Sequence, residues 1–252
     1  MTIIVILGIL SSIAISKINS NLLLQVAKNI ANDIKYTQFL ALNYDIFEKT
    51  TNYEKAYWQL YIHCVANNLN TYYGKSKCSG TINEEIGYTV FSDFLGKSTN
   101  NPDFDEIAND YLENDKKLGI PHSGIIGTKY SNRTNLTKTF NIKDIKIYHY
   151  TSKNISNISR LYFNEFGEIF HSMNKKSPYY IIKLSMKKLD KSEKCNIDEC
   201  ICVVINGITN LINIPNLSKN GQLIYYTGTK ANKPKYCHEL SSGGTTPIIT
   251  MP

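Results

Sequence analysis

The segment VILGILSSIAIS, residues Val5 to Ser16, has no charged side chain and lies close to the first residue. The uncharged apolar stretch around it, Ile3 to Ile15, is shorter than the roughly 20 residues that a membrane-spanning helix needs. A secretory signal peptide has this length, and Ser12-Ile13-Ala14 resembles a small-residue cleavage site. The positively charged segment that opens a signal peptide is absent. Neither a simple anchor nor a signal peptide accounts fully for the stretch.

The residues after Ser16 continue a helical pattern without a turn signal. Apolar or small positions recur at spacings of three and four, the period of one helix face, at Leu23, Val26, Ala27, Ile30, Ile34, Thr37, Ala41 and Tyr44. The opposite side carries Lys28, Asn32, Lys35 and Gln38. Because neither Pro nor Gly occurs over residues 9–44, we expect one helix of about 40 residues, about 60 Å long.

The length of the chain suggests a helix joined to a single head, and its charge bears on nucleic-acid binding. The chain has 252 residues, and the part outside the helix is long enough for a domain with its own core. We expect residues 1–22 to form a hydrophobic membrane or filament-core helix, residues 23–45 its amphipathic half, and residues 46–252 a periplasmic β-rich head. The net charge of +7 is spread through loops rich in Lys and Asn. This pattern favours diffuse surface charge over a nucleic-acid interface.

The head has the alternating pattern of β-strands. In AYWQLYIHC, residues 56–64, Trp58, Leu60, Ile62 and Cys64 alternate with Tyr57, Gln59, Tyr61 and His63. This alternation predicts a half-buried strand. Further strands are expected over residues 86–91, 142–150, 159–164, 179–186 and 201–205. The expected fold class is therefore α+β, with a long N-terminal helix packed on an antiparallel sheet or sandwich head.

Two turns and one insertion are also expected in the head. Asn206-Gly207 predicts a hairpin with a type I′ turn, and Gly167 in NEFGEIF indicates a second hairpin. The strand pattern fails over residues 92–136, which we interpret as an insertion with a short helix that begins after Asp103. A protein-recognition loop and a passive insertion are equally compatible with this region.

The six cysteines are Cys64, Cys78, Cys195, Cys200, Cys202 and Cys237, and all of them lie in the head. An exported head would reach an oxidising compartment, where disulfides persist. We expect a Cys64–Cys78 bridge and one or two local bridges among the other four. The alternative is a zinc site formed by Cys195, Cys200, Cys202 and Cys237-His238, although the spacing lacks the C-x2-C knuckle of structural zinc sites.

Residues with catalytic potential form no motif. The five histidines, His63, His122, His149, His171 and His238, are scattered and lie in no nucleophile elbow, HExxH helix or phosphate-binding loop. Two acidic clusters, Asp103, Asp105 and Glu106, then Asp198 and Glu199, could bind Ca²⁺, but helix capping explains the first more simply. We expect no enzyme activity, no cofactor, no metal site and no small-molecule substrate.

The N-terminal residues carry a resemblance to a known family. IIVILGILSSIAISK, residues 3–17, resembles the N-terminal helix of type IV pilins and type II secretion pseudopilins. NIANDIKYTQFLAL, residues 29–42, is similar to minor subunits of the general secretion pathway protein H and FimT-like kind. Ser16 stands where the family usually has a kinking Pro. The family's leader peptide, first Phe and Glu would precede Met1, so we expect a start site that was assigned too far downstream.

The resemblance implies a structural subunit of a secretion, pilus or DNA-uptake machine. It implies cleavage and methylation of the N-terminus, a single-pass position in the bacterial inner membrane and a head in the periplasm. The partners it implies are other pilin or pseudopilin subunits, the membrane, and a secreted substrate or DNA. Gly8, Ser12 and Ser16 form a small-xxx-small edge that allows close helix packing. The competing hypothesis is an exported periplasmic or surface protein, an adhesin or hydrolase, with a cleaved signal peptide.

Overall fold

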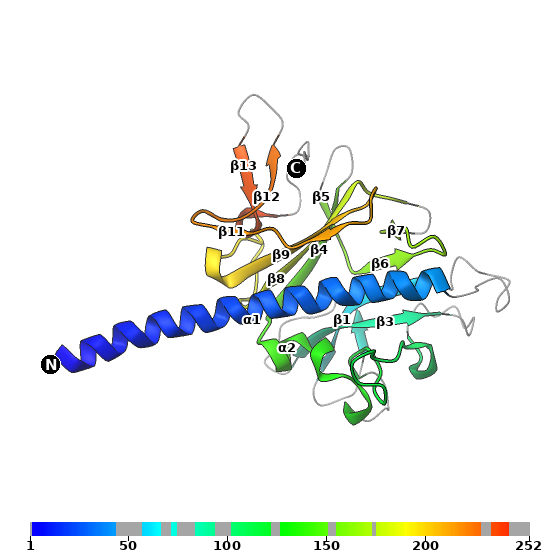
Figure 1. Ribbon diagram of the computed structural model, residues 1–252, viewed down its shortest axis with the longest axis horizontal. Coiled ribbons are helices and arrows are strands. Elements are labelled where there is room, and N and C mark those ends of the chain that lie inside the picture. The colour runs from blue at the N-terminus through cyan, green and yellow to red at the C-terminus, as the bar shows by residue number, and fades with distance from the viewer. Residues whose placement is uncertain are drawn as a thin grey trace.

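The computed structural model describes residues 2–43, 57–66, 72–74, 84–93, 102–121, 127–150, 155–172, 175–227 and 233–241, with the backbone alone over 2–20, 72–74, 225–227 and 233–235 and at residues 66, 84 and 127. Helix α1 spans Thr2–Asn43 and has 42 residues. Figure 1 shows α1 as a single helix whose C-terminal half crosses the sheets and whose N-terminal half extends beyond them. The uninterrupted helix is consistent with the lack of Pro and Gly after Gly8.

The first sheet has β1 (Trp58–Ala66) at its centre. Strand β3 (Glu84–Ser92) pairs along the whole of one edge of β1. Strands β2 (Tyr72–Gly74) and β6 (Arg160–Phe163) share the other edge, and β7 (Ile169–Phe170) pairs with β6. All these pairs are antiparallel.

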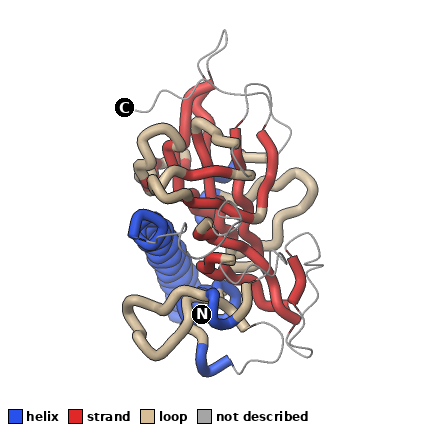
Figure 2. Tube along the Cα trace, turned by 90° about the vertical axis from the view of Figure 1, so that its right-hand side faces the viewer, coloured by secondary structure: helices blue, strands red, loops and turns tan. Residues whose placement is uncertain are grey.

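Two further antiparallel sheets complete the described strands. The second sheet has the order β10 (Ile212–Asn213), β9 (Cys200–Asn206), β8 (Tyr179–Ser185), β4 (Asp144–Tyr150) and β5 (Ile155–Ile158). The third consists of β11 (Leu217–Ser218), β12 (Gly221–Thr227) and β13 (Lys233–Tyr236). The short helices are α2 (Leu136–Phe140) and the 3-10 turns Phe104–Glu106, Gly127–Lys129, Asn132–Thr134, Ile197–Glu199 and Cys237–Glu239. Figure 2 shows the strands grouped on one side of the helix.

The expected fold class, α+β, is wrong. Strands make up 40% of the structure in three antiparallel sheets, and α1 is the one helix of seven or more residues in the described chain. The structure is therefore mostly β. Two causes explain the error: the expected helix after Asp103 is one 3-10 turn, and the strands β10, β11 and β13 are too short to show an alternating pattern.

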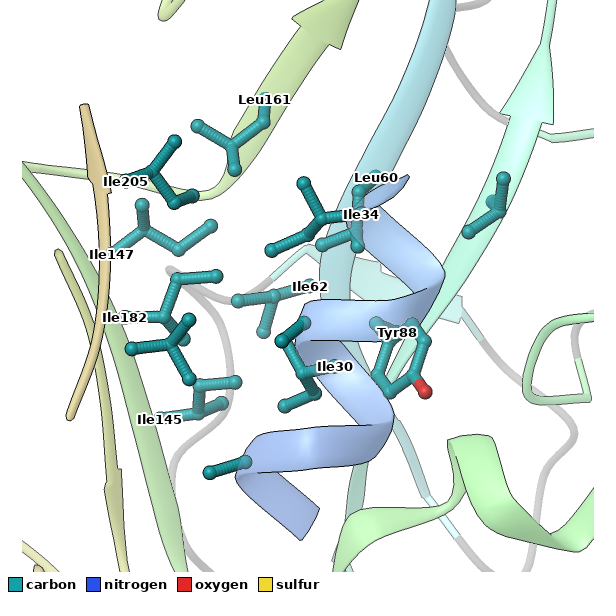
Figure 3. Close-up of a cluster of buried hydrophobic side chains, with 14 of the residues drawn as sticks. Ile30, Ile34, Leu60, Ile62, Tyr88, Ile145, Ile147, Leu161, Ile182 and Ile205 are labelled. Atoms are coloured by element: carbon teal, nitrogen blue, oxygen red, sulfur yellow. The ribbon is translucent and has the colours of Figure 1, made fainter. Parts of the chain in front are cut away.

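The main core lies where α1 meets the first two sheets. Ile30 and Ile34 of α1 are buried among Leu60 and Ile62 of β1 and residues of the second sheet (Figure 3). The second sheet contributes Ile145, Ile147, Ile182 and Ile205 to the same cluster. Leu23, Val26, Ala27, Thr37 and Ala41 are buried as their helical spacing predicts, and Tyr44 lies outside the described residues. Lys28, Asn32 and Lys35 are exposed.

The five strands predicted after β1 correspond to β3, β4, β6, β8 and β9. Strand β1 itself is confirmed, but the expectation that it is half-buried is wrong. Gln59, Tyr61 and His63 on its second face are as buried as Leu60 and Ile62 on the first. Tyr61 and the neighbouring Phe91 pack against Ile107 and Tyr130, which follow β3 in the chain. The second face is therefore covered by the region expected to be an insertion.

The turns agree with the sequence only in part. Gly167 has a φ of +69° between β6 and β7, as the predicted hairpin requires. Strands β9 and β10 also form a hairpin, but its left-handed residue is Asn210, with a φ of +59°, so the type I′ turn at Asn206-Gly207 is wrong. A Cβ at Gly207 would lie 1.9 Å from the carbonyl oxygen of Ser177. This glycine permits close backbone approach and does not form the tight turn.

The buried face of α1 gives a direct stability test. Replacing Ile30 with Asp should destabilise the protein by about 3–5 kcal/mol, because it places an unpaired carboxylate in the core. Lys28→Asp is the matched control: the exposed position should change the free energy of unfolding by about 0.5 kcal/mol or less. Denaturant unfolding of the full chain measures both values. Equal losses would show that the buried face is assigned wrongly.

Candidate functional site

A buried ion cluster of Asp33, Arg133 and Asp110 lies where α1 packs against the head. Asp33 lies on the buried face of α1, and its side chain is fully inaccessible to solvent. The Nη1 of Arg133 donates to both carboxylate oxygens of Asp33, at 2.5 and 2.6 Å. The Nε and Nη2 of Arg133 donate to the two oxygens of Asp110, at 2.9 and 2.8 Å. One guanidinium thus joins the helix to two parts of the 102–136 region.

Two tyrosines complete the cluster. The hydroxyl of Tyr88 in β3 donates to Oδ2 of Asp33, and the hydroxyl of Tyr111 donates to Oδ1 at 3.1 Å. The guanidinium carbon of Arg133 lies 4.7 Å from the centre of the Tyr111 ring. Burial, with the Asp33 charge, raises the pKa of Tyr111 to about 12, so its hydroxyl stays a donor. The helix, the sheet and the 102–136 region therefore meet at one carboxylate.

The cluster holds two carboxylates against one guanidinium. Burial raises the pKa of Asp33 above its ordinary value, although Arg133 and the two phenols act in the opposite direction. At Asp110 burial also acts to raise the pKa, but hydrogen bonds from Arg133, Ser131 and the N–H of Leu112 outweigh it, and the pKa is lowered. Such a charge cluster is stable only while all its partners remain in place.

The region expected to be an insertion extends the first sheet. Its backbone continues beyond the edge of β3, where the N–H of Ala108 donates to Val90 and the N–H of Val90 donates to Leu118, each at 2.9 Å. The expected helix after Asp103 is only the turn Phe104–Glu106, capped by the Glu106 carboxylate, which accepts from the N–H of Asp103 at 2.8 Å. Capping thus explains this acidic cluster.

Removal of the shared cation tests the cluster. Arg133→Met should destabilise the protein by about 3–5 kcal/mol, because Asp33 and Asp110 would remain buried without a counter-charge. Lys138→Met, which removes a cation from an exposed position of α2, should cost about 0.5 kcal/mol or less. Denaturant unfolding at neutral pH compares the two. Equal stabilities would contradict the role of Arg133.

The N-terminal half of α1 extends beyond the head (Figure 1). Gly8, Ser12 and Ser16 all belong to this part of α1, one helical turn apart. No charged residue occurs over residues 2–16, and Lys17 is the first cation. We expected a single transmembrane helix here; a search of the described residues finds no helix with the length and apolar character to cross a membrane.

A cavity of about 260 Å³ lies beside α1 near the point where the helix reaches the head. We call it the α1 pocket. Its apolar lining includes Leu23, Leu24, Ile197, Ile201, Ile214 and Leu217. Gln222 closes it on one side: its amide oxygen accepts from the N–H of Cys202 at 2.6 Å, and its amide nitrogen donates to the carbonyl oxygens of Cys202 and Pro215 at 2.9 and 2.8 Å. These bonds fix the walls of the pocket.

Disulfides hold the elements next to the pocket. Cys195 pairs with Cys200 and encloses the turn Ile197–Glu199, and Cys202 of β9 pairs with Cys237. The predicted local bridges are therefore present. Because all four sulfur atoms are bonded in pairs, they offer no thiolates for the alternative zinc site. Cys64 is also disulfide-bonded, but the predicted bridge to Cys78 involves a residue outside the described part of the chain.

Lys183 is a fully buried cation near these disulfides. Its ammonium donates to the carbonyl oxygens of Glu193 and Leu240, at 2.6 and 2.9 Å. The Glu193 carboxylate in turn accepts from the hydroxyl of Tyr148 at 3.1 Å and lies 3.1 Å from the ammonium of Lys146. The loop before Cys195 and the turn after β13 are thereby attached to the second sheet.

The four described histidines lie in three separate environments, and the ring of His238 stacks on that of Tyr236 at 5.7 Å. The Nε2 of His63 lies 2.7 Å from Oγ1 of Thr89, and both side chains are fully buried between β1 and β3. The rings of His149 and His171 stack at 4.0 Å, and burial lowers both pKa values, that of His171 to about 4. His122 lies outside the described residues. Within the described chain, no three His, Cys, Asp or Glu side chains are arranged to hold a metal ion.

Sequence reasoning missed the ion cluster and the α1 pocket. Asp33 belongs to the segment of residues 29–42 that carries the family resemblance, and a carboxylate between Ile30 and Ile34 on an apolar face already indicates a buried charge. Its partner Arg133 is separated from it by 100 residues. Comparison with protein-family models, curated proteins and solved structures found no match.

The two disulfides should differ in their effect on stability. Loss of the Cys202–Cys237 bridge, by replacing both residues with Ala, should cost about 4 kcal/mol, because the bridge closes a loop of 35 residues. The same change at Cys195 and Cys200 should cost about 2 kcal/mol, since that loop spans 5 residues. Denaturant unfolding measures both, and the opposite order would contradict the loop-length argument.

Proposed function

We propose that this protein is a structural subunit of a filament, a minor pilin or pseudopilin of a type II secretion or type IV pilus-like machine. The observation that carries the proposal is α1: its N-terminal half, which has no charged residue over residues 2–16, extends beyond a head to which its C-terminal half is attached. A helix with this division presents one half for assembly and keeps the other half in the core of its own head. The proposal assigns the chain no catalytic reaction.

The small residues of α1 support helix packing as the mode of assembly. Gly8, Ser12 and Ser16 repeat at four-residue spacing, which places them on one edge of the helix. Small residues at this spacing let two helix backbones approach closely, so that van der Waals contact and weak hydrogen bonds drive association. The partners we propose are other pilin or pseudopilin subunits, with the inner membrane, a secreted substrate or DNA as further contacts of the assembled machine.

The proposed location is the bacterial inner membrane, with the head in the periplasm. The uncharged stretch of residues 3–15 is shorter than the roughly 20 residues of a spanning helix, so we propose that it is stabilised among the helices of neighbouring subunits. The disulfides Cys195–Cys200 and Cys202–Cys237 support an oxidising compartment for the head.

An exported adhesin or hydrolase with a cleaved signal peptide is the second candidate, and the same disulfides favour it equally. The intact mass of the mature protein separates the two candidates. Retention of residues 2–16 supports the filament subunit. A mature chain that begins after Ala14 would remove Gly8 and Ser12 and would contradict the filament proposal.

A substitution at Gly8 tests the packing edge. Gly8→Leu should weaken self-association of the full-length protein about tenfold, the effect of losing about 1.4 kcal/mol of contact energy. The free energy of unfolding of the head should change by about 0.5 kcal/mol or less, because Gly8 is close to the N-terminal end of α1, and the N-terminal half of this helix extends beyond the sheets. Sedimentation and denaturant unfolding measure the two effects. Ile9→Leu, which leaves the small-residue edge intact, is the control.

Unchanged self-association of Gly8→Leu would contradict helix packing through this edge. Destabilisation of the head by the same substitution would instead show that the N-terminal half of α1 belongs to the fold of the monomer. A secretion or pilus-assembly assay with the two variants extends the test to the function of the machine.

A further inference from the structure

The molecule contains two apolar features that its own fold does not bring together. One is the uncharged segment of residues 2–16, which we call the projecting segment, and the other is the α1 pocket. Figure 1 shows the projecting segment extending away from the sheets. The pocket lies further along the same helix, because Leu23 and Leu24 form part of its lining.

The α1 pocket is large enough for apolar side chains of a partner. An apolar cavity of about 150 Å³ holds a benzene ring, and this cavity measures about 260 Å³. Leu24 and Leu217 on its lining are 39% and 59% exposed, although both are large apolar residues. The bonds of Gln222 and the Cys195–Cys200 bridge hold the walls in place before any partner binds. The pocket is thus preformed, which lowers the entropic cost of binding.

The projecting segment cannot reach the pocket of its own molecule. Residues 2–43 form one continuous helix, so the segment and Leu23 lie on one axis and separate by about 1.5 Å per residue. A projecting segment that occupies the pocket must therefore belong to another molecule. The solvent-facing stripe of α1 is a poor occupant because it carries two cations, Lys28 and Lys35, whereas the mostly apolar lining of the pocket offers one carboxylate, Asp198. The projecting segment has no such charge.

We infer that the α1 pocket receives apolar side chains from the projecting segment of a second copy of this chain, which lies alongside α1. This inference rests on the proposed function and names the contact through which a head accepts its neighbour's helix. The contact joins two different surfaces, the projecting segment of one copy and the α1 pocket of the next. Each copy in a chain of such contacts therefore offers its own segment to one neighbour and its own pocket to another. Such a head-to-tail contact propagates into an open assembly when its rotation does not close a ring.

Disulfide cross-linking between two differently tagged full-length variants tests the contact. One variant carries Leu217→Cys at the pocket, and the other carries Cys at Ile9, Leu10, Ser11 or Ser12 in turn. These four consecutive positions sample all sides of the helix. The described cysteines are already bonded in disulfides, so the engineered thiols report the contact. Leu112→Cys, at a residue 66% exposed in the 102–136 region, is the control for random collision.

We expect Leu217→Cys to cross-link to one or two of the four positions, at least about tenfold more than Leu112→Cys does. Adding Leu24→Asp to the Leu217→Cys variant should reduce the yield about tenfold without a loss of thermal stability, because Leu24 lies at the partly exposed pocket lining. Equal yields from Leu217→Cys and Leu112→Cys would overturn the inference. Cross-linking of Leu217→Cys only to a different pilin-like chain would overturn the second copy as the occupant.

A Gly8→Cys variant separates this inference from the proposed function. Self-cross-linking of Gly8→Cys with no yield from Leu217→Cys would leave helix packing intact and overturn the pocket contact alone. Loss of both cross-links would overturn the pocket contact and the proposed function together.

Discussion

The hydrogen bonds of Arg133, from Nη1 to Asp33 and from Nε and Nη2 to Asp110, are the constraint on which the arrangement of helix and head depends. A carboxylate on the apolar face of a helix is tolerated only when a fixed counter-charge meets it. Arg133 supplies that charge from a position 100 residues away in the chain, and Tyr88 and Tyr111 supply two further donors. Apolar packing of Ile30 and Ile34 stabilises the contact without fixing its angle, whereas a guanidinium fork sets direction.

The 102–136 region takes its role from this cluster. Its residues Asp110 and Arg133 hold α1, while Ile107 and Tyr130 cover the second face of β1. One segment thus closes the first sheet on the side away from the main core and attaches the helix on the other. This explains why the polar residues Gln59 and His63 are buried in β1: they face a second layer of protein instead of water.

Local periodicity predicted those elements whose environment repeats along the chain. The spacing of Val26, Ile30 and Ile34 and the alternation from Trp58 to Cys64 each report one buried face, and both elements occur as expected. Features set by distant residues were not predictable. The sequence predicts a turn at Gly207, but a glycine is needed there for another reason: a Cβ would collide with the carbonyl oxygen of Ser177. The cover of β1, the partner of Asp33 and the α1 pocket also come from contacts between distant segments.

The contacts that attach α1 to the head also affect any assembly built from this chain. A projecting helix can define a regular contact only if its direction relative to its head is the same in every copy. Hydrophobic contact alone permits a helix to slide or rotate by small amounts, while the charge cluster at Asp33 and the disulfide-braced turn Ile197–Glu199 restrict both motions. The position of the projecting segment relative to the α1 pocket is then a constant of the fold. A repeating head-to-tail contact requires such a constant, because an error in the angle accumulates with every added copy.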